Sequence, residues 1–422
     1  MIPIENLERF NPWWRTGKVR KEWLKGYRRQ AYFMVERDLA RRQITLIWGL
    51  RRTGKTTILF QVIEHLLEEI DPKQILYFSF DEVATGLQDV LEGFQKYILN
   101  KSFEEFEGTL YVVLDEIQKV RDWENTIKTY YDLYPRIKFF LSGSASVALR
   151  KRSRESLAGR ILDVVVRPLS FPEFLEMNGK DMSEIRKNPD LWKREIFPLF
   201  IRYLKWGTFP EIATEEDEDF ARRYLLDNIV DRIIHRDLPH EYEIRDLELL
   251  KAIVQLIGNK PGMTVIYQEL SKSLGRDQRT IANYFEYLEY GLLVRFVFNY
   301  RGSPLASMRK SKKAYLSSPN LAFALNSDFE RQLPFLLENI VCSETDAQFF
   351  YKNSFEIDFV LPENEGLVGL EVKKTGKDVK QVKRFIDTFG KRVKKAMILD
   401  IEDEGEIEGI EILPIWKFLL RS

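Results

Sequence analysis

The octapeptide at residues 49–56 constrains the fold of this chain more than any other stretch, because it follows the pattern G-x-x-x-x-G-K-[ST]. The apolar, β-branched run 44–48 before it predicts a buried parallel strand, and the helical spacing of apolar residues over 57–70 predicts a helix. When strand, loop and helix follow in this order, the backbone N–H groups of the loop and the N-terminus of the helix bind phosphate groups. The alternative is a glycine turn that arises by chance, which would not require this order. We therefore expect nucleotide contacts from Gly49, Leu50, Arg51, Arg52, Thr53, Gly54, Lys55, Thr56 and Thr57.

Side chains suited to hydrolysis accompany this loop. Lys55 can reach the β- and γ-phosphates of ATP, and the Thr56 hydroxyl can ligate Mg²⁺. The apolar run 109–114 predicts a strand that ends in Asp115 and Glu116. Beside the loop, Asp115 can hold the Mg²⁺ shell and Glu116 can polarise the attacking water; the simpler alternative is that one acid only caps the next helix. ATP or ADP and Mg²⁺ are the ligands that this pattern predicts.

Composition limits the classes of protein to which this chain can belong. A chain of 422 residues exceeds one hydrophobic core, so several domains are expected. The formal net charge is zero, which gives no overall electrostatic case for nucleic acid, so any basic surface must be local. The single cysteine and three histidines argue against a structural zinc site and fit a reducing cytosol. With no apolar signal core and no apolar stretch of about eighteen residues, we expect a cytoplasmic protein without a membrane segment.

Further elements continue the pattern around the loop. Strands are expected at 74–80 and 136–141 and helices at 87–99 and 122–134, which alternate as in a parallel sheet with helices on both faces. The basic and aromatic lead-in before residue 44 either packs near the adenine or forms a solvated amphipathic segment.

Three positions after these strands are candidates for contacting the γ-phosphate. Ser142 is the first candidate and Ser144 the second, because a small polar residue at the carboxyl end of such a strand faces the nucleotide. Both serines can equally serve a tight turn. Arg160 ends a basic run that begins at residue 150, and its guanidinium either reaches the γ-phosphate, from the same or a neighbouring subunit, or belongs to a solvated loop.

The middle of the chain is helical in pattern. Over 169–257, prolines punctuate the helices, and residues 264–300 then have the proportions of a winged helix-turn-helix, with helices at 267–274 and 278–290. Such a module contacts either DNA or another protein. The next segment, 301–313, contains basic residues and no acid, so it is either a phosphate-contacting strip or a solvated tether.

The last hundred residues hold a second group of charged side chains. Two alternating segments predict a hairpin in which Glu371 and Lys373 share one face and Asp358 meets them from the neighbouring strand. Two carboxylates can hold a divalent metal that activates water, while the lysine orients the nucleophile. The basic run 374–395 suits a phosphodiester backbone. The D-x(n)-E-x-K pattern is short, so a metal site, a retired site with Lys373 as its internal counter-ion, and no convergence at all are open alternatives.

The order of these motifs resembles the archaeal-type P-loop ATPases of the AAA+ class, in the signal-transducing (STAND-like) branch, whose C-terminal domain is similar to restriction endonucleases. The resemblance covers nearly the whole chain and rests on residues 49–56, 114–116, 141–144, 156–160, 168–175, 207–211, 338–339, 356–358 and 371–373. It implies that Pro210 is a lid proline that contacts the nucleotide and that Glu338 is the first acid of a nuclease-like site. The family usually shows Tyr-Phe-x-Asp near the start of the C-terminal domain, and residues 314–318 lack that acid.

We therefore expect an α/β protein with four parts. They are a P-loop AAA+ core with its lead-in at 1–167, a helical lid at 168–258, a winged helix-turn-helix with a basic linker at 259–313, and a restriction-endonuclease-like α/β domain at 314–422. The expected function is that of an ATP-hydrolysing switch that acts on or near DNA and self-associates through its ATPase domain. The alternatives are an ATP-regulated nuclease and a non-catalytic DNA-binding regulator. The nuclease would hold a second Mg²⁺ or Mn²⁺ among Glu338, Asp358, Glu371 and Lys373.

Overall fold

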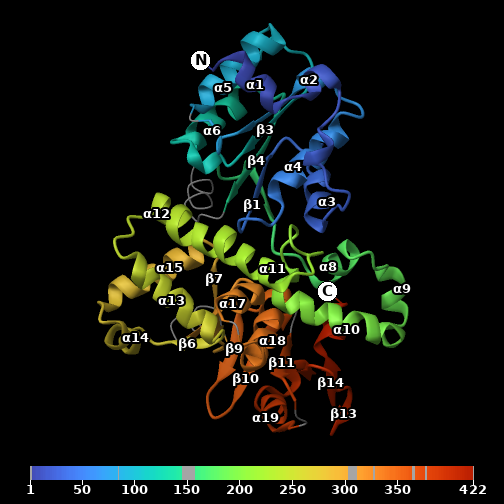
Figure 1. Ribbon diagram of the computed structural model, residues 1–422, viewed down its shortest axis with the longest axis vertical. Coiled ribbons are helices and arrows are strands. Elements are labelled where there is room, and N and C mark those ends of the chain that lie inside the picture. Colours follow the sequence, from blue (N-terminus) through green and yellow to red (C-terminus); the bar gives the residue numbers. More distant parts are fainter. Residues whose placement is uncertain are drawn as a thin grey trace. The chain divides into compact units, whose positions relative to one another are not determined.

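The chain divides into two compact units, Met1–Arg167 and Pro168–Ser422, each with its own sheet (Figure 1). The structure is a computed structural model that describes residues 2–83, 85–144, 157–302, 311–326, 328–363, 366–375 and 378–421. Within those residues, no helix is both long enough and apolar enough to span a bilayer.

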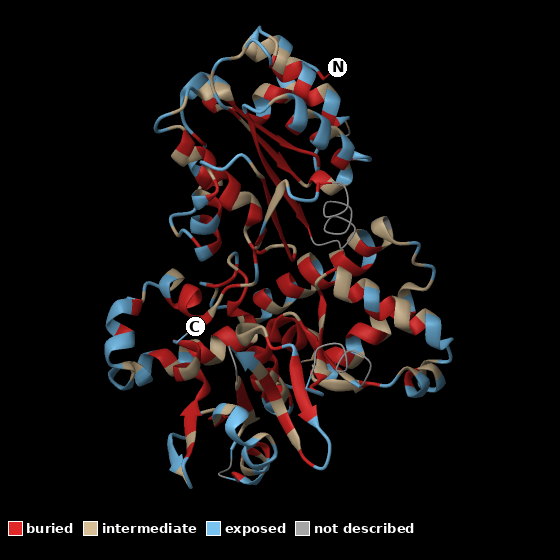
Figure 2. Cartoon of the chain, turned by 180° about the vertical axis from the view of Figure 1, so that it is seen from behind, coloured by how far each residue is buried: buried red, intermediate tan, exposed pale blue. Residues whose placement is uncertain are grey.

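The first unit is built on a five-stranded parallel sheet in the order β2-β3-β4-β1-β5. Its strands are β1 Ile44–Gly49, β2 Ile75–Ser79, β3 Leu110–Asp115, β4 Ile137–Ser144 and β5 Ile161–Val165. Its helices are α1 Ile4–Phe10, α2 Trp13–Thr16, α3 Gln30–Arg37, α4 Lys55–Leu66, α5 Leu87–Phe94 and α6 Trp123–Leu133, with short turns of helix at Lys21–Trp23, Pro72–Gln74, Gln95–Leu99 and Ile117–Lys119. Helices lie on both faces of the sheet, so β1, β2 and β4 are buried along their whole length, as Figure 2 shows in red. The α/β fold class predicted from the sequence is confirmed.

The N-terminal lead-in covers the outer edge of the sheet. The Asn11 side chain donates to the Tyr77 carbonyl at 2.8 Å and accepts from the Tyr77 amide at 2.6 Å, as a neighbouring strand would. The indoles of Trp13 and Trp14 both donate to the Ile75 carbonyl, at 3.1 and 2.9 Å. Since β2 is an edge strand, these contacts satisfy backbone groups that would otherwise be open to another chain. The expectation of a solvated lead-in is wrong for this stretch.

The second unit contains a mixed nine-stranded sheet in the order β13-β14-β12-β11-β10-β9-β7-β8-β6. Its strands are β6 Met263–Val265, β7 Val294–Asn299, β8 Lys312–Leu316, β9 Phe349–Lys352, β10 Glu356–Glu363, β11 Gly366–Lys373, β12 Val393–Asp400, β13 Gly405–Ile407 and β14 Ile410–Pro414. Its α-helices are α8 Phe171–Met177, α9 Met182–Lys187, α10 Lys193–Arg202, α11 Glu218–Leu225, α12 Leu238–Glu241, α13 Leu247–Asn259, α14 Tyr267–Leu274, α15 Gln278–Tyr290, α17 Pro319–Leu325, α18 Phe329–Thr345, α19 Lys380–Phe389 and α20 Ile415–Leu419. Shorter helical turns lie at Pro189–Trp192, Tyr203–Gly207, Leu226–Val230, Ile233–Asp237 and Gly390–Arg392.

One core runs through parts of the second unit that are far apart in sequence. Phe171 and Tyr203, from the segment expected to be a lid, belong to the same buried cluster as Phe359 and Trp416 near the C-terminus. The strands cross the expected boundaries as well, because β7 pairs with β9 in parallel and β8 occupies residues 312–316. The expected linker therefore ends inside a strand, and the finer division of this unit stays a prediction.

Candidate functional site

The phosphate-binding loop lies between β1 and α4, as its motif predicts. Gly49 ends β1 where a side chain cannot fit, since an added Cβ would lie 2.1 Å from the Val166 carbonyl oxygen. Gly54 precedes α4 with a φ of +92°, a conformation that favours glycine. The Lys55 ammonium donates to the carbonyls of Gly49 and Leu50, at 3.1 and 3.0 Å. The Lys55 side chain thus lies over the loop. It must leave these two carbonyls before it can contact a phosphate.

Asp115, the last residue of β3, is surrounded by hydroxyl groups. The Thr56 hydroxyl donates to Asp115 Oδ2 at 2.8 Å and the Tyr77 hydroxyl to the same oxygen at 3.1 Å, while the Ser142 hydroxyl donates to Oδ1. Burial and the neighbouring Glu116 carboxylate raise the pKa of Asp115, and the hydrogen bonds oppose that shift. A buried carboxylate and a loop hydroxyl in direct contact, both oxygen ligands, fit a Mg²⁺ ion.

Glu116 follows directly, with a left-handed φ of +54° that few residues other than glycine adopt. Its carboxylate reaches the end of β4. Glu116 Oε1 accepts from the Ser144 hydroxyl at 2.9 Å, and Oε2 accepts from the Gln118 side chain. A strained backbone at a side chain held on both oxygens is typical of a positioned catalytic group.

The register of the sheet separates the two candidate serines. Ser142 pairs with Ile47 and has no exposed surface, whereas Ser144 pairs with Gly49 at the rim of the sheet. Ser142 contacts Asp115, and Ser144 contacts Glu116. The geometry therefore favours Ser144 for contact with a phosphate and Ser142 for holding Asp115, the reverse of the order expected from sequence.

Arg29 supports the phosphate-binding loop, although no pattern in the sequence singles it out. It is buried just before α3, and its guanidinium donates to the Thr53 carbonyl at 2.7 Å and to the Arg167 carbonyl at 2.9 Å. It therefore braces the phosphate-binding loop against the last residue of the first unit. Nothing distinguishes it in the sequence from the other arginines of the lead-in.

Arg160 lies at the opposite end of the sheet from the loop. It precedes β5, and its carbonyl accepts from the Ile44 amide at the start of β1. Gly49 is five residues further along β1, at about 3.3 Å per residue. The Arg160 guanidinium instead forms a bidentate salt bridge with the Asp132 carboxylate, with N–O distances of 2.9 and 3.1 Å. Contact with the γ-phosphate of its own subunit is thus excluded, and the rest of the predicted basic run, 150–156, lies outside the described residues.

Pro210 belongs to the second unit. The loop around it is fixed there, since the Thr208 amide donates to Asn320 Oδ1 at 2.7 Å and the Tyr224 hydroxyl donates to Glu211. Its predicted contact with nucleotide stays a prediction.

The acids predicted in the C-terminal region come together, but around a lysine that the sequence did not assign to them. Lys313 of β8 extends its ammonium group to 2.9 Å from Glu356, 3.1 Å from Glu338 and 3.6 Å from Asp358. Glu371 pairs instead with Lys373 at 3.4 Å. Among the described residues, no group of three or more acids, histidines or cysteines is arranged to hold a metal. The alternative of a second metal site in this region is therefore not supported, whereas a retired site with an internal counter-ion stays a prediction.

The basic segments are less available than their sequences predict. Lys312 lies 3.4 Å from the centre of the Phe296 ring, and Lys313 is buried. In the C-terminal basic run, Lys383 pairs with Glu408 and Lys395 pairs with Glu411. Arg309 and Lys310 lie outside the described residues. Among the described residues of the two segments, several basic side chains are thus already held by an aromatic ring or by acids.

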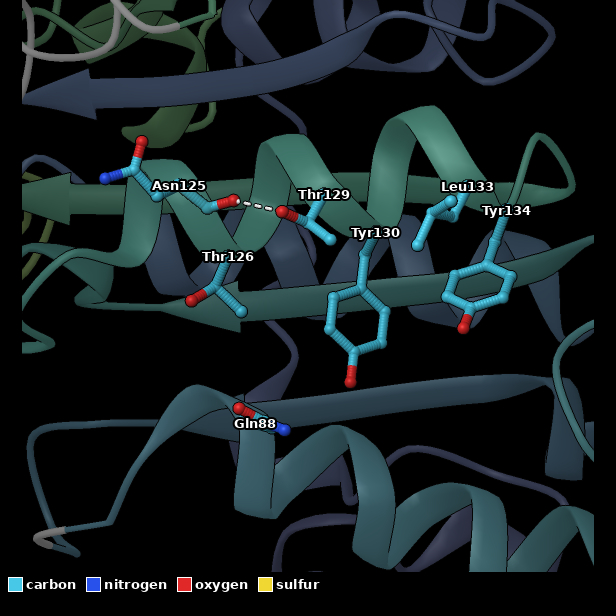
Figure 3. A pocket seen from close by; sticks show the side chains of 7 residues that line it. All are labelled: Gln88, Asn125, Thr126, Thr129, Tyr130, Leu133 and Tyr134. Carbon is cyan, nitrogen blue, oxygen red and sulfur yellow. Dashed lines mark hydrogen bonds between the residues drawn. The ribbon is translucent and has the colours of Figure 1, made fainter.

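A shallow hollow of about 360 Å³ lies between α5 and α6 (Figure 3). Its rim includes Tyr130, Leu133 and Tyr134 from α6 and Gln88 from α5, and the figure shows their side chains pointing toward the opening. None of the predicted nucleotide-binding residues lines it.

Relatives of the whole chain carry names without a function. "Uncharacterized protein MJ1544" of Methanocaldococcus jannaschii is 27% identical over 92% of this chain and 90% of its own length. An "Uncharacterized protein" of Haemophilus influenzae is 25% identical over 90% of this chain and 94% of its own length. The resemblance is thus not limited to archaea.

Two solved structures match parts of the chain at low similarity. The closed state of Hsp104 has a TM-score of 0.33 and 16% identity over 59% of this chain and 51% of its own. PCH-2 of C. elegans has a TM-score of 0.24 and 16% identity over 37% and 43%.

Two family descriptions match parts of the chain. Residues 198–332 match a family described as "Domain of unknown function (DUF8612)". Residues 41–175 match a family described as "AAA domain", and this range contains the loop, Asp115, Glu116 and Ser144. Most of the first unit is therefore similar to an AAA domain, and the P-loop lies within the matched range.

Proposed function

We propose that this protein binds and hydrolyses ATP at the loop 49–56 and uses the change of nucleotide state as a switch acting on or near DNA. The contact of Thr56 with Asp115 carries the proposal, because it joins the loop to an acid at the carboxyl edge of the sheet at 2.8 Å. Glu116 and its hydrogen bond from Ser144 supply a water-orienting group next to that pair.

Each side chain then has one role. Lys55 exchanges the carbonyls of Gly49 and Leu50 for the β- and γ-phosphates, to which its positive charge is attracted. Thr56 and Asp115 hold Mg²⁺, which when bound neutralises phosphate charge. Glu116 accepts a hydrogen bond from the attacking water and orients it.

Three further residues complete the switch in our proposal. Ser144 senses the γ-phosphate and passes its presence to Glu116 through their shared hydrogen bond. Arg160 acts only in trans, after release from Asp132, so it requires self-association of the AAA domain. Pro210 is proposed as a lid residue on the strength of the sequence resemblance alone.

Two substitutions test the ATPase proposal. We expect Lys55→Ala to abolish nucleotide affinity and Glu116→Gln to keep ATP binding while losing turnover. Binding of a fluorescent ATP analogue and steady-state phosphate release, measured on the same preparations, separate the two effects. Wild-type turnover by Glu116→Gln would remove Glu116 from the mechanism.

For the second unit, we propose a winged helix-turn-helix followed by a restriction-endonuclease-like fold. The order α13, β6, α14, α15, β7, β8 supports the first, and α18, β10, β11, α19, β12 supports the second. The STAND-like assignment has no support beyond the motif order.

DNA contact is proposed for the exposed face of α19 and the turn after it. Lys380, Arg384 and Lys391 are exposed there, whereas Lys383 and Lys395 are held by acids. We expect replacement of the three exposed residues by Gln to lower the log–log salt slope of DNA binding by about three. The matched double variant Lys383→Gln, Lys395→Gln should change it much less. Equal slopes for wild type and the triple variant would move the contact surface elsewhere.

A further inference from the structure

The acid cluster of the second unit is arranged around a buried ammonium group. Lys313 has 7% of its side chain exposed, and Glu338 and Asp358 expose 19% and 15% of theirs. Three different elements supply the cluster: α18 carries Glu338, β10 carries Glu356 and Asp358, and β8 carries the lysine. The ammonium group thus joins a helix and two strands that are not neighbours in the sheet.

Two neutral donors also contact the acids of the cluster. The Tyr315 hydroxyl, two residues along β8 from Lys313, donates to Glu338 Oε1. The Val372 amide donates to Asp358 Oδ2 at 2.9 Å. Lys313 and Tyr315 therefore lie on the same face of one strand. Together they contact acids that the nuclease interpretation assigns to a metal.

Charge in this region nearly balances without any added ion. The carboxylates are Glu338, Glu356, Asp358 and Glu371, and the ammonium groups that pair with them are Lys313, Lys352 and Lys373. Burial alone lowers the pKa of Lys313, but Glu338, Asp358 and Glu356 more than reverse this, so its pKa is raised and it stays charged. A divalent ion would have to displace or sit beside a cation that is already in close contact with three carboxylates.

We infer that Lys313 is a built-in cation that takes the place of a divalent metal, and that the cluster becomes a divalent-cation site only when Lys313 is removed. The inference does not depend on the proposed ATPase, since none of these residues belongs to the first unit. It gives Lys313 a structural role, because the ammonium group ties α18 to β8 and β10. It also predicts the ligands of the latent site, which are Glu338, Asp358 and Glu371.

Glu371 supports this choice of ligands. Its Oε2 atom is buried and accepts no hydrogen bond from the described residues, while the nearby acids raise the pKa of Asp358 further than burial alone does. Removing the Lys313 ammonium leaves Glu338 and Asp358, next to Glu371, without the cation that now contacts them. A divalent cation is the chemical species that such a set would then attract.

Thermal unfolding and Mn²⁺ binding of the full chain test the inference. The variants are Lys313→Met, which keeps the bulk and removes the charge, and Lys352→Met, which removes an exposed lysine from the same Glu356. In EDTA, we expect Lys313→Met to unfold about 10 °C lower and Lys352→Met to differ little from wild type. Added Mn²⁺ should raise the melting temperature of Lys313→Met alone, and electron paramagnetic resonance should detect one bound Mn²⁺ in it beyond wild type.

Two controls keep the test decisive. If Lys313→Met does not fold, the double variant Lys313→Met, Glu338→Gln removes one acid together with the lysine, and its recovery of stability supports the same inference. Lys313→Arg should keep the charge and bind no extra Mn²⁺. The inference is overturned if nucleotide-free wild type binds Mn²⁺ in a manner lost in Asp358→Asn, or if Lys313→Met is as stable as wild type and binds none.

Discussion

Each of the two units carries a carboxylate of interest on a strand, yet the groups around the two carboxylates have opposite chemistry. Asp115 is held by the hydroxyls of Thr56, Tyr77 and Ser142, which are neutral. Asp358 faces the ammonium group of Lys313. Hydroxyls leave the negative charge of an acid available to a metal, whereas a buried ammonium group neutralises it. An acid motif therefore predicts a metal site better where hydroxyls hold its carboxylate than where a buried ammonium group already contacts it.

The largest expected effect comes from replacing one acid in each unit by its amide, which tests this comparison directly. Asp115→Asn should lower ATP turnover about 10²–10³-fold, because it removes a charged ligand from the metal. Asp358→Asn should leave turnover unchanged and lower stability. Phosphate release and thermal unfolding, measured on both variants, give the two answers. Loss of turnover in Asp358→Asn would link the clusters in a way that the comparison denies.

An intermediate effect is expected from pH in the second unit. Burial raises the pKa of Glu371 from an ordinary 4.5 to about 7. The folded state therefore holds this proton more tightly than the unfolded state, so the stabilisation is present below about pH 4.5 and is lost as pH rises through about 7. Glu371→Gln imitates the protonated acid. Its free energy of unfolding relative to wild type should therefore rise by on the order of 2 kcal/mol from pH 5 to pH 8. Urea unfolding at both pH values measures it, and a constant difference would refute the shift.

The smallest expected effect concerns the hydroxyls of the first unit. Tyr77→Phe removes one donor from Asp115 and keeps the ring in the core, so we expect the Mg²⁺ requirement of turnover to rise about tenfold. Turnover at saturating Mg²⁺ should change less. Titration of activity with Mg²⁺ distinguishes the two, and an unchanged midpoint would show that Tyr77 does not position Asp115.

The sequence predicts the first site better than the second for physical reasons. The phosphate-binding loop and the pair Asp115 and Glu116 are short local patterns whose geometry follows from strand, turn and helix. The order of Ser142 and Ser144 needs the register of β4 against β1, which no local pattern contains.

The role of Lys313 depends on a long-range pairing. It lies outside the D-x(n)-E-x-K pattern and reaches the acids only because β8 pairs with β7, which in turn pairs with β9. One signal was available: Lys313 and Tyr315 fall on the same face if 312–316 is a strand. The run of basic residues before it concealed that strand.

Counting bound Mn²⁺ on the wild-type chain, with and without a non-hydrolysable ATP analogue, tests the contrast between the two clusters most directly. The account predicts one tightly bound Mn²⁺ per chain with the analogue and none without it, and Lys55→Ala should abolish that one. A tightly bound Mn²⁺ that persists without nucleotide and survives Lys55→Ala would place a metal in the second unit and contradict the assignment of Lys313.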